Sequence, residues 1–195
     1  GMGLDIVKLS EILIENGIET LAVSVPEEAI KLRCEGKIES EILMLSPTII
    51  KKELQLLIEN DITLTVGSNE ELNLIEEIAE ECEKDEVKVH LKIDTGFARY
   101  GFLYTDLSNI LNTFENLKRI KIVGTYTHFS KPINEKWTNL QFNRFMECIE
   151  KIKQSGYNPG IIHTASSTAF LKYHRNVARF SKNRINYSRK NAYTS

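Results

Sequence analysis

Apolar residues recur along the chain with two alternating periods, and this alternation predicts a regular series of helices and strands. Residues 4–16 carry apolar side chains at helical spacing, and Gly17 follows as a helix stop. Short runs rich in β-branched residues, such as IETLAVSV at 18–25, are typical of strands. Further strands are predicted at 41–46, 62–66, 87–94, 120–129 and 160–166, and further helices at 26–36, 48–61, 69–84, 107–117, 136–154 and 166–173.

Local signals mark three of the predicted helix starts. Pro26 suits the first turn of a helix, because its missing N–H has no partner there in any case. Ser68 with Glu71 forms the signature of a capping box. Asp106 is placed to cap the helix that follows it.

The order of elements is one helix and then six strands with a helix between each pair. The strands are short and mostly apolar, which is typical of parallel strands buried on both faces. Such alternation leaves a doubly wound sheet or a (β/α)8 barrel, and no GxGxxG follows the first strand to favour a dinucleotide fold. Because a whole barrel takes about 250 residues, we predict an α/β fold, an incomplete (β/α)8 TIM-type barrel with about six of eight parallel strands.

Composition narrows the class of protein. The chain has 195 residues, 42% of them hydrophobic and 27% charged, and its net charge of -2 argues against a general nucleic-acid binder. No apolar run approaches the roughly 18 residues of a membrane helix. Cys34, Cys82 and Cys148 form neither a metal spacing nor a disulfide framework, which predicts a cytoplasmic protein.

The last segment, His174 to Ser195, differs from the rest. It holds six Lys or Arg residues and no Asp or Glu, and it loses apolar periodicity. One interpretation is a solvated basic tail that binds RNA or an anionic surface. A second interpretation depends on the resemblance described below.

Polar residues gather where the predicted strands end. In a barrel, chemistry is carried out at the C-terminal ends of the strands, and we expect the side chains found there to share one face. The candidates are Asp94, Arg99, His128, His163, Ser166 and Ser167.

Each candidate also has a structural interpretation. A histidine at a strand end is often only hydrogen-bonded, and the spacing offers no third ligand for a metal, so no metal is predicted. Arg99 is either a surface arginine or an anion clamp whose fork suits carboxylate or phosphate. Ser166 and Ser167 either cap a helix or bind phosphate through its free N–H groups.

His90, Lys92 and Asp94 alternate on one face of the strand 87–94. A lysine inside a barrel needs a partner, and Asp94 is the candidate. The residue pattern alone therefore predicts a phosphate-bearing small molecule at the strand ends, beside an arginine and a histidine.

Three segments together resemble the alanine racemase family. VHLKIDTGFARYGF resembles the family pattern LKxDTGMxRxG, THFS resembles its THF segment, and HTASSTAFL resembles its HxANSAA segment. The resemblance covers nearly all of residues 1–173 in order. It implies a (β/α)8 barrel followed by a β-rich domain, and pyridoxal phosphate held by a lysine for racemisation of alanine, serine or another small amino acid.

The resemblance also assigns roles to residues of the cofactor pocket. Ser167 would hold the cofactor phosphate, with Ser166 in the place of a family Asn, and His128 would lie beside the pyridine ring. Leu43 and Leu45 match apolar residues near that ring.

Two basic residues receive roles in the same way. Arg99 would orient the phenolic oxygen of the cofactor and the substrate carboxylate, and Lys92 matches a lysine that many members carry as a carbamate supporting this arginine.

The chain departs from the family at both ends. Gly1-Met2-Gly3 matches only the end of the family's Lys-x-x-x-Tyr-Gly-x-Gly segment, which contains the cofactor lysine. The tyrosine that serves as second base belongs to the β-rich domain, which is absent from the sequence. We therefore expect no covalent attachment of pyridoxal phosphate, and a truncated protein that is inactive or weakly active.

The basic tail then has a second interpretation, as the product of a frameshift. One set of codons for FSKNRINYSRK, shifted by one base, encodes LVRIGLIILG, which resembles the family's eighth strand, VRxGxxxxG. We accordingly divide the chain into a partial barrel domain, 1–173, and a basic non-family tail, 174–195.

Three functions remain in order of preference. The first is an alanine racemase-like protein with little or no catalysis, the second a non-catalytic module that binds pyridoxal phosphate or another phosphate ligand, and the third a protein that binds nucleic acid through its tail. Strands 18–25 and 160–166 would be open edges of the incomplete barrel, and open edges pair with other chains. We therefore also expect a homo-oligomer.

Overall fold

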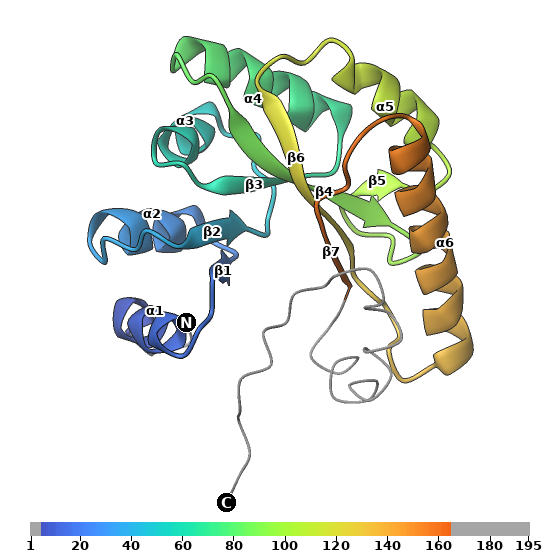
Figure 1. The fold of residues 1–195 in the computed structure, drawn as a ribbon, viewed down its shortest axis with the longest axis horizontal. Coiled ribbons are helices and arrows are strands. Elements are labelled where there is room, and N and C mark those ends of the chain that lie inside the picture. Colours follow the sequence, from blue (N-terminus) through green and yellow to red (C-terminus); the bar gives the residue numbers. More distant parts are fainter. Residues whose placement is uncertain (1–4, 165–195) are drawn as a thin grey trace, which may run out of the picture.

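The computed structural model describes residues 5–164, in which helices and strands alternate (Figure 1). The helices are α1 (Ile6–Glu15), α2 (Pro26–Cys34), α3 (Lys51–Glu59), α4 (Asn69–Glu81), α5 (Leu107–Phe114) and α6 (Glu135–Gln154). The strands are β1 (Thr20–Val23), β2 (Glu41–Met44), β3 (Thr63–Val66), β4 (Val87–Asp94), β5 (Phe102–Leu103), β6 (Ile120–Thr127) and β7 (Ile161–Thr164). The helix predicted at 166–173 lies outside the described residues.

Six strands form one parallel sheet in the order β1-β2-β3-β4-β6-β7. This order follows the chain, and the helices line the sheet in sequence order (Figure 1), as in part of a barrel wound in one direction. The predicted α/β class and the incomplete barrel of six parallel strands are confirmed. The two-residue strand β5, which pairs with the end of β4, was not predicted from the sequence.

The two faces of the sheet differ in chemistry. Alternate side chains of the strands face the helices and form one apolar core, because successive side chains of a strand point to opposite sides. The opposite face of the central strands is also buried, but it carries polar groups rather than the apolar ones expected of strands with both faces buried. These buried polar residues are Thr63, Thr65, His90, Lys92 and Asp94.

The strand register brings these polar residues into rows across the sheet. Thr65 of β3 lies level with His90 of β4. One step further along, Lys92 of β4 lies level with Tyr126 of β6, which in turn lies level with His163 of β7. We call this polar face of the sheet, which points away from the helices, the concave face. Its side chains can bind polar or charged molecules.

Most local signals at helix ends are confirmed, with two corrections. Pro26 opens α2, and the Ser68 hydroxyl accepts a hydrogen bond from the Glu71 N–H at 3.1 Å. The Glu71 carboxylate accepts a hydrogen bond from the N–H of Gly67 at 2.6 Å, whereas a capping box would use the N–H of Ser68. Asp106 precedes α5, but the prediction that it caps the helix was wrong, because its carboxylate accepts from the Asn109 side chain at 2.5 Å instead.

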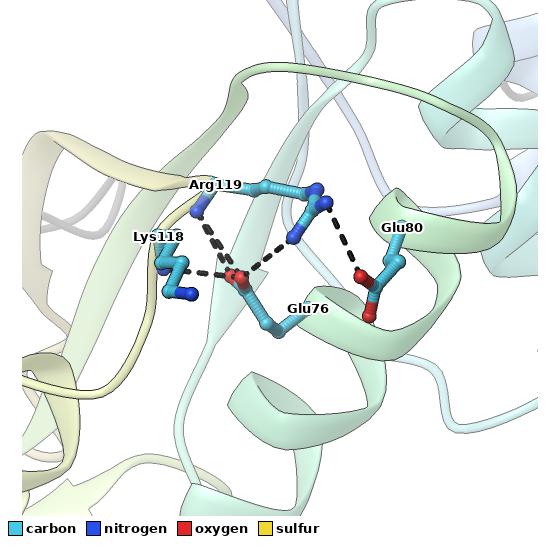
Figure 2. A network of polar contacts seen from close by, with 4 residues as sticks. All are labelled: Glu76, Glu80, Lys118 and Arg119. Atoms are coloured by element: carbon cyan, nitrogen blue, oxygen red, sulfur yellow. Dashed lines mark hydrogen bonds and ion pairs between the residues drawn. The ribbon is translucent and has the colours of Figure 1, made fainter.

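The N-terminal end of β6 is held to α4 by one carboxylate (Figure 2). Glu76 accepts hydrogen bonds from the backbone N–H groups of Lys118, at 3.0 Å, and Arg119. The Arg119 guanidinium contacts Glu76 and Glu80, each at 3.4 Å. Because Glu76 is the less exposed of the two carboxylates, it supplies the stronger contact.

Within residues 5–164, no helix combines the length and the apolar character that a membrane span needs.

Two glycines precede β7, and only one of them lies against the backbone of β6. Gly156 and Gly160 both have positive φ, +85° and +65°. A Cβ on Gly156 would meet nothing within 4 Å, whereas a Cβ on Gly160 would lie 2.1 Å from the backbone carbonyl of Val123 in β6.

We predict that Gly160→Ala destabilises the fold more than Gly156→Ala. Both substitutions incur about 1–2 kcal/mol from the left-handed backbone, and only Gly160→Ala adds a clash of about 1–3 kcal/mol. Urea unfolding of both variants measures the two losses. Equal losses would contradict the close approach of β7 to β6.

Candidate functional site

Asp94, the last residue of β4, shapes the loop that follows it. Its carboxylate accepts hydrogen bonds from the N–H groups of Gly96 at 2.8 Å, Phe97 at 2.7 Å and Arg99 at 3.1 Å. The loop also contains Ala98 at a φ of 59°, a conformation that L-residues rarely adopt. The three hydrogen bonds offset the cost of this tight turn and set the position from which Arg99 projects.

Lys92 is buried on the concave face, and its partner is not the predicted one. The carboxylate of Asp94 is occupied by backbone N–H groups, and Lys92 instead places its Nζ 4.1 Å from the ring centroid of Tyr100 and 5.5 Å from that of Tyr126. The pKa of Lys92 is lowered to about 8, mainly by burial and then by the positive charge of Arg99, while Asp94 opposes the shift. Aromatic faces thus take the place of a carboxylate beside this ammonium group.

Arg99 and His128 come together across Phe97. The Arg99 guanidinium lies 4.3 Å from the Phe97 ring centroid, and the Phe97 and His128 rings pack edge-to-face with centroids 5.2 Å apart. Burial lowers the pKa of His128, and the charges of Arg99 and Lys92 add to the effect. His128 is therefore neutral near pH 7 and offers one N–H donor and one acceptor.

Two tyrosines that the sequence analysis missed converge on the end of β2. The hydroxyl groups of Tyr100 and Tyr126 donate to the backbone carbonyl of Leu45 at 3.0 and 3.2 Å. Tyr126 also lies 3.2 Å from the Thr65 hydroxyl, and burial raises its pKa. Leu43 is buried in β2, so the predicted pair of leucines lies at the same end of the sheet as these tyrosines. Tyr126 lies two residues before His128 at the end of β6, and this spacing was the available signal for the tyrosine.

His163 lies deeper in the sheet than the strand-end residues. Its Nε2 is 3.0 Å from Nδ1 of His90, and its ring stacks on Tyr126 with centroids 4.7 Å apart. Burial lowers the pKa of His90 to about 4 and that of His163 to about 3. The His90 ring fits against β6 only because Gly124 has no Cβ, which would lie 2.4 Å from that ring. This pair is therefore neutral, and it forms part of the floor of the concave face.

Within residues 5–164, no three His, Cys, Asp or Glu side chains gather as a metal site. Ser166, Ser167 and the tail 174–195 lie outside residues 5–164, and so does the phosphate contact predicted for the two serines. The predicted site residues that the structure brings together are Lys92, Arg99 and His128. Leu43 is buried in β2, and the backbone carbonyl of Leu45 accepts from the two tyrosines.

Helix α6 supplies side chains to the site that the sequence analysis also missed. Trp137, Gln141 and Arg144 face the loops that follow β4 and β6. Their spacing of four and three residues places them on one face of a helix. Polar residues at that spacing on an otherwise amphipathic helix were the signal that could have found them.

The charges of the site suit an anionic ligand. Neither Lys92 nor Arg99 forms an ion pair with a carboxylate of the described residues. A buried ammonium beside a guanidinium repels it, and a bound anion would relieve that repulsion. An anionic ligand with a ring could contact these two cations and the Phe97 ring beside Arg99.

Comparison with known proteins agrees with this geometry. Residues 1–184 match the family described as "Alanine racemase, N-terminal domain". The chain is 36% identical over 179 residues to the alanine racemase of Methanococcus maripaludis, covering 89% of this chain and 47% of that protein. It is 33% identical over 172 residues to the alanine racemase of Treponema denticola, covering 86% of this chain and 45% of that protein.

Solved structures show the same likeness. The alanine racemase of Clostridium difficile 630 superposes with a TM-score of 0.78 at 30% identity, covering 85% of this chain and 44% of that chain. The alanine racemase of Bacillus anthracis with bound L-Ala-P superposes with a TM-score of 0.76 at 30% identity, covering 87% and 44%. The chain thus spans about half the length of the relatives it matches.

The buried ammonium of Lys92 makes stability depend on pH. The folded protein loses this proton near pH 8, whereas the unfolded chain keeps it up to about 10.5. Because the unfolded state binds more protons in that interval, Lys92 makes folding more favourable as the pH rises from 8 to 10.5.

We predict that Lys92→Met removes this dependence. The difference in urea midpoint between wild type and Lys92→Met should shift in favour of wild type between pH 7 and pH 10. Lys88→Met, at an exposed lysine of the same strand, serves as the control. A difference that is constant over this range would contradict the burial of a charged Lys92.

Proposed function

The chain belongs to the family of alanine racemase N-terminal domains, and on that premise we propose that its concave face binds pyridoxal phosphate for amino-acid racemisation. The observation that carries the proposal is the meeting of Arg99 and His128 across Phe97 at the ends of β4 and β6. Lys92 lies close enough to Arg99 for their charges to interact, and it forms no ion pair with a carboxylate of residues 5–164. Alanine is the proposed substrate, and serine is the next candidate.

Each of these residues has a distinct task in the proposed site. The fork of Arg99 donates to an oxygen anion, either the phenolic oxygen of the cofactor or the carboxylate of the substrate. Neutral His128 offers a hydrogen bond beside the ring without adding a positive charge. Lys92 raises the positive potential around Arg99, because it is itself buried and close to that residue.

The remaining contacts follow the resemblance. Leu43 and Leu45 supply apolar contacts to the ring, and Ser167 with Ser166 supplies the phosphate contact. When bound, pyridoxal phosphate acts as an electron sink that stabilises negative charge on the substrate α-carbon.

We propose that this 195-residue chain by itself binds the cofactor non-covalently and racemises alanine weakly or not at all. Within residues 1–195, Gly1-Met2-Gly3 matches the end of the family segment that contains the cofactor lysine. A non-catalytic binding module is the alternative function, and it would use the same residues.

The first experiment is a titration of the chain with pyridoxal phosphate, followed by absorbance and by tryptophan emission. We expect saturable binding, and about tenfold weaker binding by Arg99→Ala, because a charge-assisted hydrogen bond is lost. Lys121→Ala, at the opposite end of β6, should bind as wild type. Equal affinities of wild type and Arg99→Ala would contradict the assignment of Arg99.

The same samples test the reaction. Formation of D-alanine from L-alanine above the rate of free pyridoxal phosphate would show that the chain is a racemase by itself. Saturable binding without that rate would favour the binding module.

We also propose that the chain self-associates through the β1 edge. Among the described strands β1 pairs only with β2, which leaves the backbone groups of its other side unpaired. The neighbouring helix α1 exposes Ile12 and Leu13, and Ile18 lies exposed just before β1. Apolar side chains beside an open strand edge favour pairing with another chain.

Sedimentation velocity at tens of micromolar tests this proposal. We expect a dimer or larger assembly, and a shift toward monomer for Ile12→Glu, which places a charge in the exposed apolar cluster. A monomeric wild-type chain would rule out self-association through this edge at these concentrations.

A further inference from the structure

Side chains of helix α6 contact the backbone of the loop that follows β4. The Nη1 of Arg144 donates to the carbonyl of Thr95 at 3.0 Å. Gly96 has a φ of +128°, and the position of its missing Cβ lies 3.1 Å from the Trp137 ring and 3.2 Å from Arg144. The indole and the guanidinium therefore cover the turn of this loop closely.

Gln141 joins the same loop to the loop after β6. Its Oε1 accepts from the Ser130 N–H at 3.0 Å and from the Ser130 hydroxyl at 3.1 Å, and its Nε2 donates to the Thr95 hydroxyl at 3.3 Å. A backbone N–H only donates, so the Ser130 contact determines which end of the amide is the oxygen. The Trp137 Nε1 donates to the Ser130 hydroxyl at 2.8 Å.

The hydrogen bonds continue from Thr95 into the sheet. The Thr127 hydroxyl donates to the carbonyl of Ile93 at 2.8 Å, so it accepts from the Thr95 hydroxyl, 3.0 Å away. Thr95 and Gln141 are 0% exposed and Thr127 is 1% exposed. Because water does not reach these groups, the loss of one partner leaves another without a hydrogen bond.

We propose that Gln141 is a positioning residue that sets the distance between the two loops of the site. One loop, 94–101, carries Arg99, and the other, 128–134, begins with His128. Their relative position determines how Arg99 and His128 meet across Phe97 and therefore how an anionic cofactor fits between them. The identity of that ligand rests on the proposed function, whereas the coupling of the loops does not.

The test compares three substitutions in α6. Gln141→Glu replaces the donor nitrogen of the amide with oxygen, so it removes the N–H that bonds to Thr95 and brings a carboxyl group into a buried position. Gln154→Glu makes the same chemical change at an exposed position of the helix. Ile152→Val removes a buried methyl group that is not part of the polar network, and it controls for a general loss of stability.

Hydrogen exchange of the 195-residue chain, read by mass spectrometry, measures the coupling. We expect Gln141→Glu to raise the exchange rate of both loops, 94–101 and 128–134, by about tenfold, because a buried donor bond is lost between them. Gln154→Glu should match wild type, and Ile152→Val should leave the loops within twofold. Unchanged loops, or a change equal to that of Ile152→Val, would overturn the inference.

A second pair of variants covers the case in which Gln141→Glu does not fold. Thr127→Val breaks the chain of hydrogen bonds at its next member, and Thr127→Ser keeps the hydroxyl group. Faster exchange of 94–101 in Thr127→Val, restored in Thr127→Ser, supports the network. Equal exchange in both variants would overturn it.

Titration with pyridoxal phosphate, followed through Trp137, the single tryptophan, gives the functional consequence. We expect about tenfold weaker binding by Gln141→Glu and wild-type binding by Gln154→Glu, since displaced supporting residues commonly cost that factor. If wild type shows no saturable binding, the proposed function fails while hydrogen exchange still decides the coupling. If Gln141→Glu binds as tightly as wild type, the inference fails while the proposed function stands.

Discussion

The site depends on one carboxylate at the end of a central strand. Where β4 ends, the chain turns sharply, and the free backbone N–H groups of that turn need acceptors. Asp94 accepts from three of them and thereby holds Phe97 and Arg99 in place. The same use of Asp94 leaves Lys92 without its expected acidic partner, so both basic residues keep their charge available for a ligand.

The electrostatic character of the site follows from this arrangement. Lys92 and Arg99 repel each other in a partly dry environment, and the charged group of each lies over an aromatic ring, that of Tyr100 for Lys92 and that of Phe97 for Arg99. Such a site is unfavourable while empty and becomes favourable when an anion binds. Two cations without acidic partners among the described residues agree with the proposed binding of pyridoxal phosphate.

Stability and function occupy different parts of the same sheet. The helix-facing side is apolar and continuous, and the Glu76–Arg119 contact holds β6 at its N-terminal end, away from the site. The concave side is polar and carries the residues assigned to the ligand. Helix α6 belongs to both parts, because Phe145 and Ile149 lie in the core while Gln141 and Arg144 reach the loops.

The sequence by itself determined the order of the helices and of the six main strands, the parallel barrel-like sheet, the placement of Arg99 and His128 after strand ends, and the placement of Lys92 on one face of its strand. Each of these follows from local periodicity or from a contiguous motif. Only the tertiary structure decided that Asp94 binds backbone rather than Lys92, and that Tyr126 and Gln141 belong to the site. The contacts of Asp94 are local, but the choice between backbone N–H groups and Lys92 depends on how the loop after β4 turns. The contacts of Tyr126 and Gln141 join residues far apart in sequence, and they are set by how strands and helices pack, which no local pattern encodes.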